Sequence, residues 1–416
     1  MSPIWYKSMK LTTLILIILM FFLLLVRLFF DSIDRHIYRA GEKVKITHSF
    51  LKEPKKNSYG QYFFTGNLLV SVPLYPKFLY GETIIIEGIV SELKNEKGRL
   101  LAIENPKITR VESKSPLFLI TSFIRKRVEG AVLTTLPSRE SGLFLGIVLG
   151  VRDRINNAFY EELRDAGVLH IIAASGQNVS ILASILLAAF QRSVKRRYAL
   201  LFTGLCLFLY SAIVGFDPPI VRATIMATIS FGALTFGRQN TALFALFITG
   251  WGMVMYQPEN LTSISFQLSF LSTLGIIMIK PLIERVFTIR FLGLVKDDLT
   301  TTLAAQIATF PLMIASFGAY SLLTLPVNLL ILWTIPFLMI LGVGSTILAI
   351  VVPLLAKPLI LLSYPFLAYF AVVIDLSEKY KWVVEFDSIP GAFICGYYLI
   401  VIGIIFSLKN SERRRI

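Results

Sequence analysis

Most of the chemically versatile residues in the apolar part of this chain fall within one short stretch. They are Arg152, Asp153, Arg154, His170, Ser175, Gly176, Gln177 and Asn178. A charged side chain at the depth of a bilayer costs upward of about 2.5 kcal/mol on insertion scales, so such residues normally face a bundle interior or a water-filled path. The stretch therefore predicts a functional site.

Two kinds of chemistry suit this stretch. Gly176 permits either a close helix crossing or a break in a helix, and a broken helix presents free N–H groups and a positive dipole end that suit a phosphate. Ser175 with His170 suggests a nucleophile and its base. Their spacing, the lack of a G-x-S-x-G elbow and the lack of an evident third group argue against that interpretation.

Another cation lies in an apolar segment that opens with Asp217-Pro218-Pro219. Proline is tolerated in the first turn of a helix, so these residues fix a helix start and place Arg222 one turn inside it. The guanidinium either snorkels to the membrane interface or faces a pore. Asp217 and Asp153 are its candidate partners.

Amides recur in the later apolar segments. Gln267 follows Ser263 at i+4 on one helix face, Gln306 precedes Phe310-Pro311, and Asn328 follows Pro326. Hydrogen bonding between helices, worth about 0.6 kcal/mol on average in membranes, is one explanation. The other is that these amides line a path, since they offer donors and acceptors without a fixed charge.

Metal chemistry is not expected. The chain has two cysteines, Cys206 and Cys395, each in an apolar segment, and only three histidines. This set is too small for a Cys/His zinc site, and the cysteines suit small core positions. We expect no metal and no cofactor.

The elements that position these residues are membrane helices. Of 416 residues, 55% are hydrophobic and 16% are charged, and the mean hydropathy is +0.70. Long apolar runs with backbone groups satisfied internally predict an α-helical polytopic membrane protein. Residues 117–136 carry charges in mid-run and predict an interfacial helix. The apolar segments are 11–30, 171–190, 198–215, 219–236, 241–256, 264–280, 300–318, 322–340, 341–374 and 391–407.

A different composition marks the region before these helices. Residues 38–112 are polar, and four β-rich runs alternate with turn-like segments. Four or five short strands predict a small all-β domain of the OB type, and such domains often stack single strands on aromatic side chains. The candidate aromatics are Tyr59, Tyr62, Phe63, Phe64, Tyr75 and Tyr80.

The formal net charge of +15 has two explanations, the positive-inside rule and attraction of a polyanion such as nucleic acid. Basic clusters at 192–197, 285–296 and 409–415 predict cytoplasmic loops and a cytoplasmic C-terminus. Lys7 and Lys10 before the first apolar segment predict a cytoplasmic N-terminus and an extracytoplasmic β domain in a multi-pass cell-membrane protein. The expected domains are an N-terminal anchor (1–35), the OB-like domain (36–114), a multi-span domain (115–410) and a basic tail (411–416).

Several motifs together resemble one known family. They are GIVLGVRDRI, AGVLHIIAASGQNVS, PPIVRATIMA, FQLSF and the region from FPLMIASFG to PVNLL, in this order. The chain resembles the ComEC-type competence DNA-internalisation channels in its order of parts along nearly its whole length. This resemblance implies a membrane channel that passes single-stranded DNA into the cytoplasm during natural transformation.

The resemblance also implies particular expectations. Relatives commonly have Leu-His-Val-Gly after the Ser-Gly pair, where this chain has Gln177, Asn178, Val179 and Ser180, so imidazole chemistry is not expected at Asn178. Many relatives carry a C-terminal metallo-β-lactamase-like domain that is not expected here, so the resemblance implies a conduit without a catalytic centre. The implied partners are single-stranded DNA, the lipid bilayer, a separate nuclease, a DNA receptor, a cytoplasmic motor and a second copy of the chain.

The residues alone leave three function classes open. In a conduit, Arg152, Arg154 and Arg222 attract DNA, Asp153 pairs with an arginine, and the neutral polar residues line the path. A polytopic membrane enzyme on a lipid-linked or peptide substrate would use Asp153, His170 and Ser175. A structural subunit of a DNA-uptake assembly would use the OB-like domain while another protein forms the pore.

Overall fold

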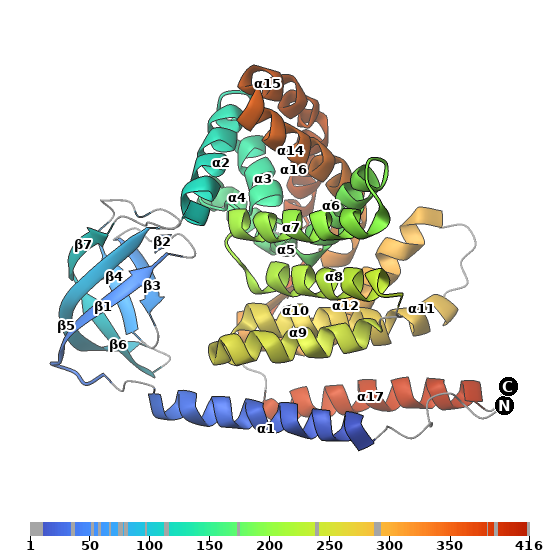
Figure 1. The fold of residues 1–416 in the computed structure, drawn as a ribbon, viewed down its shortest axis with the longest axis horizontal. Coiled ribbons are helices and arrows are strands. Elements are labelled where there is room, and N and C mark those ends of the chain that lie inside the picture. The colour runs from blue at the N-terminus through green and yellow to red at the C-terminus, as the bar shows by residue number, and fades with distance from the viewer. Residues whose placement is uncertain are drawn as a thin grey trace. The chain divides into compact units, whose positions relative to one another are not determined.

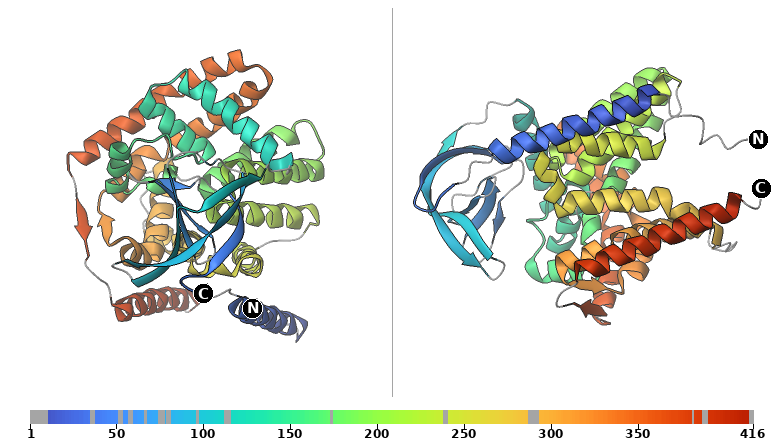
Figure 2. Two further views of the ribbon diagram at one scale, coloured as in Figure 1. Left: turned by 90° about the vertical axis from the view of Figure 1, so that its left-hand side faces the viewer. Right: turned by 90° about the horizontal axis from the view of Figure 1, so that it is seen from below.

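A computed structural model describes most of the chain (Figures 1 and 2). The described residues are 11–34, 38–50, 54–56, 60–65, 68–73, 78, 82–95, 98–111, 116–172, 175–237, 241–286, 293–380, 382–386 and 390–413. They form two compact units. The first, N-terminal unit consists of Met1–Ser122 and Trp251–Glu259, and the second consists of Phe123–Gly250 and Asn260–Ile416. We describe each unit by itself.

The N-terminal unit contains the β domain that the sequence predicts. Its sheet has the order β1-β5-β6-β4-β3-β2, and β7 pairs with β5. Among the described strands of this sheet all pairs are antiparallel except β4 with β6. The strands are β1 (Lys43–Ser49), β2 (Lys55–Lys56), β3 (Gln61–Thr65), β4 (Leu68–Val72), β5 (Thr83–Asn95), β6 (Gly98–Glu104) and β7 (Lys107–Val111).

The long strand β5 gives this sheet its half-barrel form. Its first half pairs with β1 and β7, and its second half, from Val90, pairs with β6. A Cβ on Gly88 would lie 2.4 Å from Ile103, so only glycine fits where the strand changes partners. Figure 2 shows the resulting curl. The domain is therefore OB-like, as predicted.

The strand count differs from the expected four or five. The run at 61–74 holds two strands, since Thr65 at the end of β3 pairs with Leu68 at the start of β4. The run at 99–111 also splits, because Asn105 takes a positive φ of 48° before Pro106. Alternation persists through both turns, which hides them in the sequence. Within the described residues the sheet has seven strands.

The predicted stacking aromatics are dispersed. Phe63 is buried in the core of the domain with Phe50 and Phe78, whereas the ring of Phe64 is 54% exposed. Tyr62 lies on β3 and is partly buried. Tyr59, Tyr75 and Tyr80 lie outside the described residues.

The first apolar segment forms helix α1 (Leu11–Asp34). Arg27, the charge near its end, donates from Nε to the Met255 carbonyl at 3.3 Å, and Trp251 Nε1 donates to the Met20 carbonyl at 2.9 Å. Both partners lie in the last turns of α9 (Ala242–Tyr256), which belong to the same unit. The interior arginine therefore has a hydrogen-bond acceptor.

The second unit is helical (Figure 1). A short two-stranded sheet of β8 (Ala319–Ser321) and β9 (Val383–Glu385) interrupts it. The remaining elements are α2 (Pro116–Leu133), α3 (Ser138–Leu149), α4 (Asn157–Asp165), α5 (Leu169–Ile172), α6 (Gly176–Gln191), α7 (Arg196–Val214), α8 (Pro218–Thr235), η2 (Pro258–Thr262), α10 (Ile264–Met278), α11 (Lys280–Val286), α12 (Gly293–Phe317), α13 (Thr324–Ile331), α14 (Thr334–Val351), α15 (Pro353–Leu362), α16 (Tyr364–Glu378) and α17 (Gly391–Arg413).

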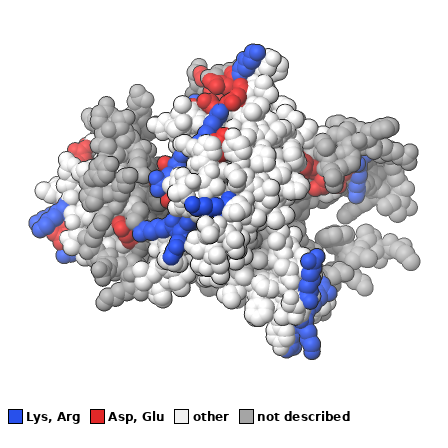
Figure 3. All heavy atoms as spheres, turned by 90° about the horizontal axis from the view of Figure 1, so that it is seen from above, with Lys and Arg blue, Asp and Glu red and all other residues white. Residues whose placement is uncertain are grey.

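Five helical segments among the described residues are long and apolar enough to cross a membrane. The pair α15 and α16, bent by 42°, adds a sixth if it counts as one span. Large apolar side chains such as Leu201, Leu399 and Phe406 are more than 60% exposed on these helices. On the face drawn in Figure 3, charged side chains gather in small groups on a largely uncharged surface. Such a surface is solvated by lipid.

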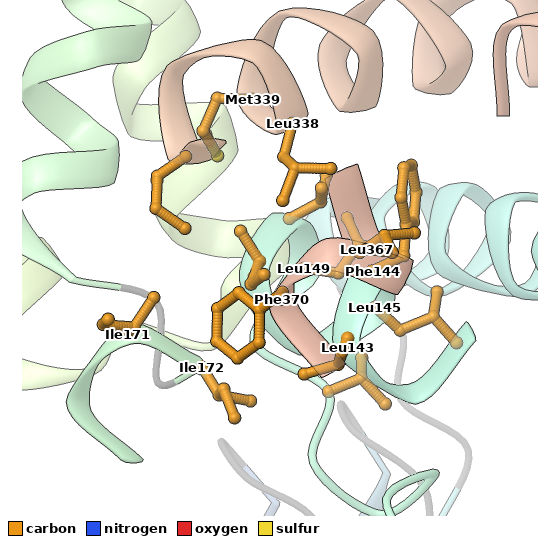
Figure 4. Close-up of a cluster of buried hydrophobic side chains, with 14 of the residues drawn as sticks. Leu143, Phe144, Leu145, Leu149, Ile171, Ile172, Leu338, Met339, Leu367 and Phe370 are labelled. Carbon is orange, nitrogen blue, oxygen red and sulfur yellow. The ribbon is translucent and has the colours of Figure 1, made fainter. Parts of the chain in front are cut away.

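Most of helix α3 lies in the core of the helical unit. Every residue from Ser141 to Leu149 is buried. Its apolar side chains pack with α5, α14 and α16 (Figure 4). Helix α14 approaches most closely at Gly342, where a Cβ would lie 2.4 Å from a methyl group of Val148. Because α3 is surrounded by protein, its position is set by packing on all sides.

The proline-rich block from residue 326 resolves into four helices. Helix α13 ends at Ile331, α14 ends at Val351, and only Ser363 separates α15 from α16. Proline at the start of α15 and α16 suits two of these breaks, since its fixed φ favours the first turn of a helix and it lacks the N–H that a helix interior uses.

Candidate functional site

Two carbonyl groups at the end of α3 organise the site. The helix ends at Gly150, which has a left-handed φ of 69°. The N–H groups of Gly150 and Val151 bond the carbonyls of Gly146 and Leu145, which leaves the carbonyls of Ile147 and Val148 without a backbone donor. Asn178 Nδ2 donates to the Ile147 carbonyl at 3.0 Å, and Tyr210 Oη donates to the Val148 carbonyl at 3.2 Å.

The start of α6 lies against this end of α3. Ser175 is extended (φ −103°, ψ 165°) and caps α6, with its Oγ accepting from the Asn178 N–H at 3.4 Å. The same hydroxyl donates to Asn178 Oδ1 at 3.2 Å. The segment from His170 to Asn178 is therefore not one continuous helix, because Ser175 separates α5 from α6. Of the two alternatives that Gly176 permits, the structure has the break.

Arg222 on α8 reaches the same helix start. Its side chain is 8% exposed, and Nε donates to Ser269 Oγ on α10 at 2.7 Å. Nη1 donates to Thr273 Oγ1 on the same helix face. A Cβ on Gly176 would lie 2.5 Å from Nη2, so the guanidinium occupies the space that a side chain there would need.

The partners of Arg222 differ from those expected. Neither Asp217 nor Asp153 bonds its guanidinium; within the described residues its polar contacts are Ser269, Thr273 and the sulfur of Met226. The reason is geometric, because Ser269 and Thr273 lie one turn apart on the face of α10 that packs against α8.

The loop after α3 carries the other predicted charges. Arg152, Asp153 and Arg154 are all exposed, and Arg154 Nη2 lies 3.0 Å from Glu129 Oε2 on α2. The Ile155 N–H donates to the Arg152 carbonyl at 3.0 Å, which closes a turn. The turn directly follows the capped end of α3, so the capping bonds of Asn178 and Tyr210 also position this loop.

The remaining predicted residues are placed as follows. His170 on α5 and Gln177 in the first turn of α6 are exposed. Gln267 Nε2 donates to the Leu261 carbonyl at 2.6 Å. Gln306 Nε2 and Asn328 Oδ1 are buried without a hydrogen-bond partner among the described residues. Gln267, Gln306 and Asn328 lie on α10, α12 and α13, so the structure gathers only part of the predicted set around the start of α6.

Three contributing residues are missing from the predicted set. Tyr210 looks like an ordinary aromatic residue in an apolar helix, and nothing in the sequence pairs it with α3. Thr273 follows Ser269 at i+4, so the two residues lie on one face of α10. This spacing could have identified Thr273 from the sequence. Glu129 lies in a mixed-charge run that does not reveal its partner.

Comparison with known proteins gives a consistent pattern. A family model described as "Competence protein" matches residues 147–411. ComE operon protein 3 of Bacillus subtilis (strain 168) is 27% identical over 217 residues, which cover 51% of this chain and 27% of that protein. An uncharacterized protein of Aquifex aeolicus (strain VF5) is 31% identical over 153 residues, which cover 36% of this chain and 34% of that protein. The matched regions thus span about a third or less of these relatives, and no solved structure matches.

Proposed function

Because this chain belongs to the competence protein family, we propose that it conducts single-stranded DNA across the cytoplasmic membrane during natural transformation. The observation that carries the proposal is the junction of α3 and α6. There the capping of α3 by Asn178 holds an arginine-bearing loop next to a helix start that offers free N–H groups. Cations attract a strand with one negative charge per nucleotide, and neutral polar groups let it pass.

Within this proposal the residues divide into two roles. Arg152 and Arg154 attract the strand from their exposed loop, while Gln177 offers an uncharged, exposed amide in the first turn of α6. Asn178, Ser175 and Tyr210 act as positioning residues, because their polar groups are engaged in caps. The membrane-enzyme alternative finds less support, since the Ser175 hydroxyl is occupied at the helix start.

The proposal extends to partners and orientation. The OB-like domain lies outside the cytoplasmic membrane, and both chain ends lie in the cytoplasm. A separate nuclease, a DNA receptor and a cytoplasmic motor act with the chain, which works as a conduit without a catalytic step of its own. Assembly of two or more copies is compatible with this role.

Uptake of labelled DNA by cells tests the proposal. The double variant Arg152→Ala, Arg154→Ala is expected to abolish uptake while normal amounts of protein remain in the membrane. Arg164→Ala is the matched control, because Arg164 is equally exposed but pairs with Glu161 on its own helix. Its uptake is expected to match that of the unmodified chain.

A second control separates attraction of DNA from structural support. Glu129→Gln removes the ion-pair partner of Arg154 and keeps both arginines. A strand-attracting role predicts that this variant keeps uptake. If Glu129→Gln and the double variant lose uptake equally, the loop charges form a structural ion-pair network. If the double variant takes up DNA normally, the loop charges do not contact the strand.

A further inference from the structure

The guanidinium of Arg222 is a buried cation without an anion. Within the described residues no carboxylate forms an ion pair with it, and its neutral partners are Ser269, Thr273 and Met226. Buried charges are normally paired or bound to a counter-ion, since removing a charge from water is expensive. Two hydroxyl groups orient the guanidinium but do not neutralise it.

The start of α6 increases this imbalance. A helix N-terminus carries about half a positive charge, and the Arg222 guanidinium lies against its first residue. Among the described residues no partner occurs for the N–H groups of Gly176 and Gln177, while Ser175 caps only Asn178. Two positive features therefore lie in contact, an arrangement that costs free energy unless an anion binds beside them and contacts both.

The hydrogen bonds fix which side of the guanidinium remains available. Thr273 Oγ1 donates its own hydrogen to the Ser269 carbonyl at 2.9 Å, so its lone pairs face Arg222. Nε and Nη1 are used by α10, and Nη2 is directed to Gly176. A larger residue at position 176 would displace Nη2. The site thus presents one guanidinium N–H edge and two backbone N–H groups, a donor set that suits phosphate oxygens.

We propose that Arg222 and the first two amides of α6 bind a backbone phosphodiester of the strand in transit. The inference rests on the proposed conduit function and adds the chemical group that the site recognises. The contact reads the backbone and no base, so it accepts any sequence. It also makes transport depend on the negative charge of the backbone.

The salt dependence of binding tests the site. The full-length chain is placed in nanodiscs of zwitterionic lipid, and a fluorescent oligothymidylate is titrated between roughly 50 and 200 mM salt. Loss of one phosphate contact is expected to lower the slope of log affinity against log salt by about 0.7 for a single strand. Arg222→Gln is expected to show this loss, Arg222→Lys to retain most of the slope, and Arg164→Gln to leave it unchanged.

Further arms keep the test decisive. If Arg222→Gln does not fold, Gly176→Ala, which crowds Nη2, is expected to reduce affinity and slope in the same direction. An unchanged slope in every folded Arg222 and Gly176 variant would overturn the inference. A change in slope that occurs only in nanodiscs with anionic lipid would also overturn the inference. The phosphodiester bound at the site would then belong to a lipid headgroup.

Failure of this inference is distinguishable from failure of the conduit. If the unmodified chain binds the oligonucleotide and supports uptake while Arg222→Gln behaves identically, only the phosphate site is overturned. If the unmodified chain neither binds single strands nor supports uptake, the conduit proposal and this site fall together.

Discussion

The carboxamide of Asn178 caps helix α3, although the residue belongs to α6. Its Nδ2 supplies the donor that the Ile147 carbonyl lacks, and its Oδ1 accepts from Ser175. An amide can do both at once because it is a donor and an acceptor. A neutral imidazole offers the same pair of functions.

We predict that Asn178→His keeps stability and uptake close to those of the unmodified chain. Asn178→Leu leaves a buried carbonyl without a donor and is expected to lower the free energy of unfolding by about 1–3 kcal/mol. Thermal unfolding in detergent measures the difference. Equal destabilisation by both substitutions would show that side-chain shape, and not hydrogen bonding, decides the position.

At the scale of elements, α12 contains a proline, and another helix replaces the hydrogen bond that this proline removes. Pro311 has no N–H, so the Ile307 carbonyl four residues earlier loses its helical donor. Tyr397 Oη on α17 donates to that carbonyl at 2.9 Å, and Tyr398 Oη donates to the Ala308 carbonyl at 3.0 Å. These two bonds attach the peripheral helix α17 to α12 at the proline, in addition to the packing of Val401 and Ile405 against Ala304 and Ala308.

The double variant Tyr397→Phe, Tyr398→Phe is expected to loosen α17, at a cost of about 0.5–1.5 kcal/mol per hydrogen bond. Hydrogen exchange of α17 amides measures this effect. In a Pro311→Ala background the Ile307 carbonyl regains a helical donor, so the Tyr397→Phe change is expected to cost less there. Equal costs in both backgrounds would contradict the link between the proline and the tyrosine.

At the scale of the whole molecule, orientation follows from charge. The chain carries 41 Lys and Arg residues, and short loops with clustered Lys and Arg normally stay in the cytoplasm. The loop before α7 holds Arg192 and Lys195, and α7 begins with Arg196 and Arg197. The β domain follows the first helix and is expected on the opposite side.

Reporter fusions check this orientation. A reporter after Lys94 is expected outside the cytoplasmic membrane, and reporters at Lys195 and after Arg415 are expected inside. An accessibility assay in intact and permeabilised cells distinguishes the two sides. Fusions at Lys94 and Lys195 that report the same side would reverse the assignment of the β domain.

The sequence by itself determined the class of the protein, the OB-like domain and most helices. Long apolar runs have few stable forms in lipid, and period-two alternation is a local property of strands. It also allowed a helix break at Gly176 beside a close helix crossing, since caps and glycines act within a few residues. The strand count was too low because alternation continued from β3 into β4 and past Asn105.

Only the tertiary structure decided which polar groups meet. The contacts of Asn178 with Ile147, of Tyr210 with Val148 and of Arg222 with Ser269 join residues 31, 62 and 47 positions apart. Each depends on how α3, α6, α7, α8 and α10 pack. Helix packing is set by side-chain shape over whole faces, and the polar spacing in one segment does not encode it. For that reason the sequence named Arg222 correctly as an unusual residue and assigned it the wrong partners.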